Sequence, residues 1–156
     1  MTVTAPPTRR TTVVALLLVL AVAATTGCSS STGAGANGSR VDVTVKDFDV
    51  VTSRKTVPAG TVDFHITNHG PSTHEINVDR TRYSTGYIPR QRDGLTADES
   101  AAGLRRIDSI EQLNLHDDQD LIVRLRPGRY VLWCNLEGHY LGGMHETIDV
   151  VADGHR

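Results

Sequence analysis

Near its carboxyl end the chain reads Tyr130-Val-Leu-Trp-Cys134-Asn-Leu-Glu-Gly-His139-Tyr-Leu-Gly-Gly-Met144. A thiol, an imidazole and a thioether follow one another here with four residues between each pair, and a glycine stands directly before the histidine and before the methionine. Glycine readily adopts the backbone conformations that a tight loop needs. The stretch therefore predicts a buried strand that runs into a loop with three candidate metal ligands.

The donor types in this loop point to copper. Thiolate and thioether sulfur bind Cu(I), imidazole binds both oxidation states, and two histidines, one cysteine and a weak axial methionine form electron-transfer copper sites. Cys134, His139 and Met144 provide all of these except the second histidine. We predict His74 as the missing ligand, because it follows a turn and opens an alternating apolar stretch. His69, inside the preceding turn, is the alternative.

The pattern Cys134-x4-His139-x4-Met144 resembles the copper loop of the cupredoxins, the type 1 blue-copper proteins. The segment 57–75, which ends in His74-Glu75, is similar to the strand pair that delivers their first histidine ligand. The resemblance covers roughly residues 41–151, apart from 79–116. It implies an all-β, antiparallel Greek-key sandwich or barrel with a helix or long-loop insertion, and one copper ion, Cu(I) or Cu(II), per chain. Many relatives have an amide that braces the loop where this chain has Glu75.

Alternating apolar and polar residues support the same fold class without the resemblance. Short stretches with this period of two are separated by turn signals, which is typical of an antiparallel sandwich or barrel. The segment before Cys134 is apolar at every position and predicts a central strand that is covered on both faces. The expected strands are 41–46, 62–67, 74–78, 121–126, 130–134 and 147–151.

The segment 79–116 is the least regular part of the chain. Thr96-Ala-Asp-Glu99 fits a capping box, which predicts a short helix that ends near Gly103. Two interpretations of the whole segment stay open. It is an insertion that covers an open end of the sandwich, which we favour, or a docking surface for a redox partner.

The first 27 residues have the features of an export signal. Arg9 and Arg10 precede an apolar run, 12–24, that is too short to remain as a membrane span. The run leads to Thr25-Thr-Gly27-Cys28, which resembles a bacterial lipoprotein box, so we expect a signal peptide over 1–27 and acylation, including palmitate, on Cys28. An ordinary secretory leader that is cut nearby is the alternative.

The composition after Cys28 divides the rest of the chain. Residues 28–39 are small and polar and predict a flexible tether, 40–152 form the copper-binding domain, and 153–156 are a polar tail. Loss of the leader removes Arg9 and Arg10 from the 16 basic residues and none of the 18 acidic ones, so the mature net charge is −4. No basic stripe interleaved with aromatic residues is present in the sequence, which argues against nucleic acid as a partner.

Cysteine usage adds a constraint on Cys134. The chain has two cysteines, so lipid on Cys28 would leave Cys134 without a disulfide partner in an oxidising compartment. Metal ligation explains both this thiol and its neighbours. The alternatives for Cys134 are a disulfide to Cys28 and an inert buried thiol.

A closed set of four ligands leaves no open position for a substrate, so we expect a carrier and not an enzyme. We expect a monomer that is lipid-anchored on the extracytoplasmic side of the cell membrane, with a secreted or periplasmic protein as the alternative. It would pass single electrons between membrane redox complexes or small redox proteins by transient docking, with Leu136, Tyr140 and Leu141 as an apolar contact patch. A copper chaperone or storage lipoprotein, and a copper-free binding or structural lipoprotein, are the rival functions.

Overall fold

The computed structural model describes residues 1–2, 38–84 and 87–152. The predictions for the leader, for Cys28, for most of the tether and for the tail lie outside these residues. Within the described part of the chain, no helix is long and apolar enough to cross a membrane.

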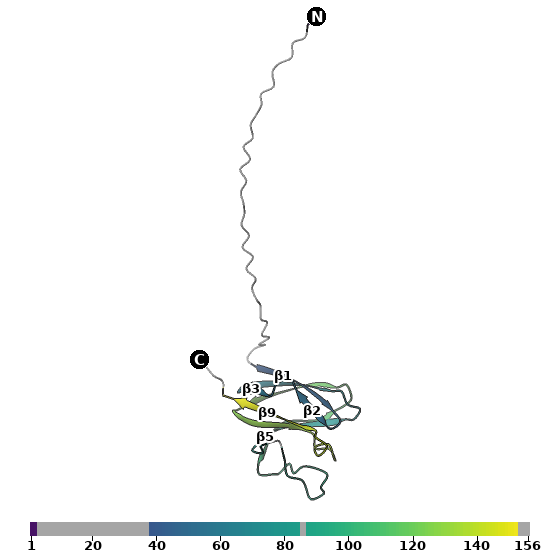
Figure 1. Ribbon diagram of the computed structural model, residues 1–156, viewed down its shortest axis with the longest axis vertical. Helices are drawn as coiled ribbons and strands as arrows, with labels where there is room; N and C mark the ends of the chain where they lie inside the picture. The colour runs from purple at the N-terminus through teal and green to yellow at the C-terminus, as the bar shows by residue number, and fades with distance from the viewer. Residues whose placement is uncertain (3–37, 85–86, 153–156) are drawn as a thin grey trace. The chain divides into compact units, whose positions relative to one another are not determined.

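The described residues form strands that stack as two sheets, and they contain no helix (Figure 1). The all-β sandwich predicted from the alternating pattern is therefore confirmed. The strands are β1 (Gly38–Lys46), β2 (Asp49–Thr52), β3 (Thr56–Pro58), β4 (Gly60–Asn68), β5 (His74–Thr81), β6 (Leu104–Leu113), β7 (Asp118–Leu125), β8 (Gly128–Trp133) and β9 (His145–Val151).

Both sheets are mixed: most neighbouring strands pair in the predicted antiparallel direction, and two pairs are parallel. The strand orders are β2-β1-β4-β7 and β3-β9-β8-β5-β6. β1 runs parallel to β4, and β3 runs parallel to β9, while the other neighbours are antiparallel. The chain passes through β3 in the opposite sheet before β4 returns beside β1, and a connection of this kind allows the parallel direction.

The main core lies between the two sheets. Val41, Val43 and Val45 of β1 are at most 1% exposed, and they pack with Phe64 of β4 and Leu132 of β8. Each fully buried side chain of this size contributes about 1.5–3 kcal/mol relative to an exposed one. The alternation seen in the sequence is thus the inward face of each strand.

A second, smaller core covers the outer face of the five-stranded sheet. Val131 and Trp133 of β8 pack there against Ile88, Ala97 and Tyr140. This arrangement confirms that β8 is apolar on both faces. It corrects one interpretation of the insertion, because the segment between β5 and β6 covers the face of a sheet and not an open end of the sandwich.

The helix predicted to begin at Thr96 does not form. The capping groups have other partners: the Asp93 carboxylate accepts hydrogen bonds from the amide (3.2 Å) and hydroxyl (2.9 Å) of Thr96. Glu99 instead pairs with Arg106 at 3.2 Å and accepts a hydrogen bond from Asn135 at 2.9 Å. The sequence also failed to predict β6, an edge strand that pairs only with β5 and is mostly exposed, so it lacks a regular apolar face.

Candidate metal centre

Three of the predicted ligands meet at one end of the sandwich. His74 opens β5, Cys134 directly follows β8, and His139 lies in the loop between β8 and β9. One donor atom from each lies within 4.8 Å of the others, and Cys134 Sγ is 3.6 Å from His139 Nδ1. His69 is exposed and does not belong to this cluster. The structure therefore brings His74, and not the alternative histidine, to the thiol.

The cluster is buried and contains an imidazole nitrogen with no partner. His74, Cys134 and Met144 are 0% exposed, and Met144 belongs to the same main core as Cys134. His74 Nδ1 has no hydrogen-bond partner among the described residues, and Nε2 lies 3.2 Å from Asp47 Oδ1 without a well-directed hydrogen bond. A buried polar atom left unpaired costs about 1–3 kcal/mol. A metal ion bound to this imidazole would remove that cost.

Burial shifts the protonation equilibria of the donors. Burial lowers the pKa of His74, and the nearby His139 lowers it further, so the neutral imidazole that binds metal is favoured. Burial raises the pKa of the Cys134 thiol, although the backbone amides of Glu75 and Leu136 hydrogen-bond to the sulfur and lower it. A coordinating metal deprotonates a thiol outright. These amides are positioned to stabilise the resulting thiolate.

Hydrogen bonds within the loop hold the donors at fixed positions. The Cys134 amide donates to the Met144 carbonyl at 3.1 Å, and the Met144 amide donates to the His139 carbonyl at 3.0 Å. Gly138 and Gly143 have φ angles of 78° and 112°, in the region that favours glycine. The glycines seen in the sequence are therefore required by the turns that place His139 and Met144.

Solved structures match the fold of this chain, whereas no protein-family model and no curated protein matches the chain. An auracyanin from Roseiflexus castenholzii is 19% identical with a TM-score of 0.50, over 72% of this chain and 97% of that one. Auracyanin A, a "blue" copper protein from Chloroflexus aurantiacus, is 17% identical with a TM-score of 0.50, over 73% and 99%. Rusticyanin from Thiobacillus ferrooxidans is 16% identical with a TM-score of 0.53, over 75% and 79%. The chain has the cupredoxin fold.

Within this cupredoxin fold, the donor set fits one copper ion. Two imidazoles and a cysteine converge, and a buried methionine lies in the same core. This combination of nitrogen and soft sulfur donors is the one that copper electron-transfer sites use. The observation that decides the fit is the buried His74 Nδ1, which faces no other partner in the described structure.

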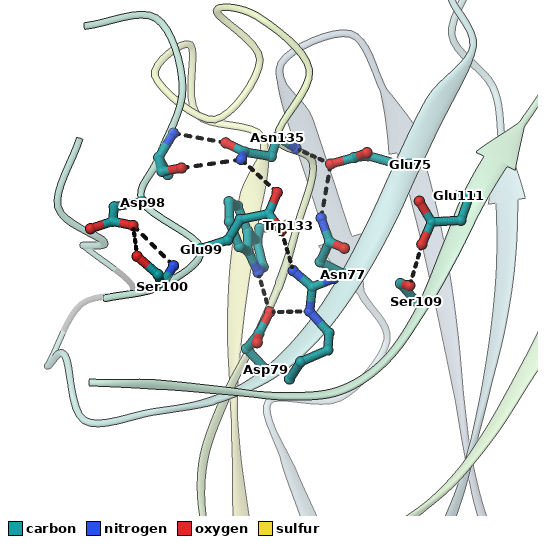
Figure 2. A network of polar contacts seen from close by, with 12 residues as sticks. Glu75, Asn77, Asp79, Asp98, Glu99, Ser100, Ser109, Glu111, Trp133 and Asn135 are labelled. Carbon is teal, nitrogen blue, oxygen red and sulfur yellow. Dashed lines mark hydrogen bonds and ion pairs between the residues drawn. The ribbon is translucent and has the colours of Figure 1, made fainter. Parts of the chain in front are cut away.

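Glu75 braces the loop in place of the amide found in many cupredoxins (Figure 2). Its Oε1 accepts hydrogen bonds from the Asn135 backbone amide and from the Asn77 side chain, both at 2.9 Å. The Asn135 side chain accepts from the Ala97 amide at 2.7 Å and donates to the Ala97 carbonyl at 3.1 Å. The residue after Cys134 is thereby fixed both to β5 and to the insertion.

The indole next to Cys134 is also held in place (Figure 2). Trp133 Nε1 donates to Asp79 Oδ2 at 2.7 Å, and Arg106 Nε pairs with the same oxygen at 3.1 Å. Asp79 is 1% exposed, and its burial raises the pKa of its carboxyl while these two donors oppose the shift. The Arg106 guanidinium also lies 6.0 Å from the centre of the Trp133 ring. This network anchors the end of β8 from which the metal loop departs.

The surface beside His139 differs from the predicted patch. Tyr140 is only 4% exposed, belongs to the second core and accepts a hydrogen bond from the Ile88 amide at 2.5 Å. Leu136 is 38% exposed, as expected, and Leu141 is half-buried. Phe48, which the sequence did not reveal, is 50% exposed, and its ring centre lies 5.3 Å from that of His139.

Two further differences concern Phe48 and His145. Phe48 lies between β1 and β2, about ninety positions before His139 in the sequence, so only the packing of distant segments brings the two rings together. Its φ of 63° is rare for a residue with a side chain, and no sequence pattern predicts a positive φ at this position. The position of His145, next to Met144, predicts a surface residue on the opposite face. In the structure His145 is half-buried, its ring centre lies 4.9 Å from that of Tyr140, and burial lowers its pKa.

Proposed function

We propose that the chain holds one copper ion through His74, Cys134, His139 and Met144 and carries single electrons. The convergence of a thiol and two imidazoles, one of them buried without a partner, carries this proposal. Copper supplies one-electron chemistry through its Cu(I) and Cu(II) states. Four donors leave no open position for a substrate, which supports a carrier and not an enzyme.

The protein holds the donor atoms at fixed positions and shields them from water. Backbone hydrogen bonds close the loop, and Glu75 and Asn135 tie it to neighbouring segments. Donors that move little require little reorganisation when the charge of a bound ion changes. The buried surroundings of Cys134 and His74 exclude water, which is one of the factors that set a reduction potential.

The proposed exchange partners are membrane redox complexes or small redox proteins. His139 is the least buried of the three clustered donors, and the exposed side chains of Phe48 and Leu136 lie in its vicinity. A small apolar surface of this kind suits weak and short-lived contacts. We further propose a monomer that is anchored through lipid on Cys28 at the outer face of the cell membrane.

Titration of the metal-free protein with Cu(II) tests the proposed function. We expect one equivalent to bind with an intense thiolate charge-transfer band in the visible spectrum, and Cys134→Ser to abolish that band. His69→Gln is the matched control, because His69 is exposed outside the cluster, and it should leave the band unchanged. Tight binding without the band, or a band that survives Cys134→Ser, would refute the proposal.

The rival role of a copper chaperone predicts rapid metal exchange. Three of the four proposed ligands are 0% exposed, which hinders direct transfer of the metal to another protein. A competing Cu(I) chelator distinguishes the roles, since a chaperone would release its copper readily whereas the proposed carrier retains it.

A further inference from the structure

A cleft lined by arginines lies at the end of the sandwich opposite the metal centre. It encloses about 410 Å³ where β5 ends and where β6 and β8 begin. Its lining includes no acidic residue. The arginines that line it are Arg80, Arg82, Arg105 and Arg129.

Most of the positive charge in this cleft has no counter-charge among the residues that the structure describes. Within the described part of the chain, Arg129 pairs through two hydrogen bonds with Asp149, at 2.8 and 3.1 Å, and Arg80 donates only to the Pro127 carbonyl at 2.9 Å. Among the described residues, the guanidinium groups of Arg82 and Arg105 have no ion-pair partner. Within 38–84 and 87–152, three of the four arginines therefore have no acidic partner.

The strand register places two of these charges side by side. Arg80 of β5 stands directly opposite Arg105 of β6 in the antiparallel ladder. Like charges at directly opposed positions destabilise a sheet. A bound anion would remove this repulsion, and guanidinium groups match a phosphate group through paired hydrogen bonds.

The position of the cleft indicates the source of such a phosphate. β1 begins at Gly38, which pairs with Thr61 near the start of β4. The amide of Ala59, just before β4, donates to the end of β9 at 2.8 Å, and β9 ends beside the start of β8 that lines the cleft. Gly38, the first described residue of the domain, therefore lies at the same end as the cleft.

With lipid on Cys28, as proposed above, the length of the connecting chain would bring the cleft within reach of a membrane. Ten residue steps separate Cys28 from Gly38, and ten residues span at most about 35 Å. The metal centre lies at the other end of β5, about 25 Å further away for a strand of this length. A cleft that faces the lipid would leave the metal centre facing outward.

We propose that this arginine cleft binds the phosphate of anionic phospholipid headgroups and so orients the domain on the membrane. The proposal rests on the lipid anchor proposed above, but not on copper binding. The chain carries a formal net charge of −2, so its overall charge would repel an anionic surface. Attraction must come from a local cluster, and each arginine near such a surface strengthens binding about fivefold.

Vesicle sedimentation of the exported chain with Cys28→Ser, which removes the acylation site, tests the cleft without the anchor. We expect binding to phosphatidylglycerol vesicles and none to phosphatidylcholine vesicles. Arg82→Gln combined with Arg105→Gln should weaken binding about thirtyfold. Arg54→Gln combined with Arg124→Gln removes the same charge from exposed positions outside the cleft lining, and should change binding less than threefold.

Three results would overturn the proposal: no binding to the anionic vesicles, equal weakening by both double variants, or complete displacement by millimolar inorganic phosphate. The last result would identify a site for free phosphate. Copper titration of each variant separates this proposal from the proposed function. A chain that binds vesicles but no copper disproves only the electron-carrier role, and a chain that binds copper but no vesicles disproves only the headgroup site.

Discussion

Glu75 links two segments of the candidate site through a single carboxylate oxygen. Oε1 accepts hydrogen bonds from the backbone of Asn135 and from the side chain of Asn77, and the Glu75 amide hydrogen-bonds to the Cys134 sulfur. The identity of this residue matters because it stands between the first histidine and the loop. The sequence showed a departure from the amide of many cupredoxins, and in the structure a Glu75 carboxylate oxygen braces the loop.

Replacement of Glu75 separates its bracing role from its charge. Glu75→Gln keeps an acceptor for both donors, whereas Glu75→Ala leaves the Asn135 amide without its partner. We expect Glu75→Ala to lower the free energy of unfolding by about 2 kcal/mol and Glu75→Gln by less than about 1 kcal/mol. Urea denaturation of the metal-free proteins measures both values. Equal losses in the two variants would show that the hydrogen bonds do not stabilise the loop.

His74 makes the stability of the metal-free protein depend on pH. Burial lowers its pKa below the ordinary value of 6.5. As the pH falls through 6.5, the unfolded chain binds a proton that the folded chain does not, so the free energy of unfolding decreases. We expect the urea midpoint to fall between about pH 7.5 and 5.5, with a slope from one such group of at most about 1.4 kcal/mol per pH unit.

The variant His74→Gln provides the control for this dependence. It removes one group that titrates, while His145, whose pKa burial also lowers, and Asp79, whose pKa burial raises, remain in both proteins. The slope should become shallower in the variant. An unchanged slope would mean that His74 does not contribute to it.

Asn135 joins the metal loop to the segment between β5 and β6. Its side chain bonds to both backbone groups of Ala97, which places Ala97 in the second core with Trp133. The loop and the insertion thus stabilise each other. The insertion packs on the Trp133 ring, and Trp133 directly precedes Cys134 in the sequence. These two hydrogen bonds are tertiary contacts, because Asn135 and Ala97 are 38 positions apart in the sequence.

Asn135→Ala should remove both hydrogen bonds to Ala97. It leaves the amide and carbonyl of Ala97 without partners, so we expect a loss of about 2 kcal/mol in the free energy of unfolding and faster hydrogen exchange at the Ala97 amide. Gln112→Ala, on exposed β6, is a control that should change stability by less than about 0.5 kcal/mol. Normal protection of the Ala97 amide in Asn135→Ala would contradict the assignment.

The strands differ in how far their sequences predict them. β1, β4 and β7 each bury one face, so their apolar residues alternate and the sequence predicts them. β6 is an exposed edge strand and gives no such pattern. The capping box at Thr96 misled the prediction, because its hydroxyl and its glutamate are taken by Asp93 and by Arg106. Local patterns cannot reveal such competing partners.

The two ends of the sandwich have different chemistry. The metal donors lie where β5 begins and β8 ends, and the arginine cleft lies where β5 ends and β8 begins. A rigid β-sandwich therefore keeps a proposed electron-transfer centre and a proposed membrane contact about one strand length apart. Substitutions in the cleft should leave the metal centre intact.

Copper should stabilise the entire domain, since its proposed ligands come from β5 and from the loop between β8 and β9. A ligand at 100 times its dissociation constant adds about 2.7 kcal/mol. We expect Cu(II) to raise the melting temperature of the metal-free protein by about 10 °C in calorimetry. Cys134→Ser should show a much smaller rise, and an equal rise would place the stabilising ion elsewhere.

The amino-acid sequence was sufficient to predict the all-β class, most inward-facing residues and the donor types of the metal loop. These features are local, because alternation reports burial of one strand face and the glycine spacing reports a loop. Only the tertiary structure brought His74 to Cys134, 60 positions away, placed Phe48 against His139 and set Arg80 opposite Arg105. Those contacts depend on strand order and register. Both arise from the packing of distant segments, so a local sequence pattern does not predict them.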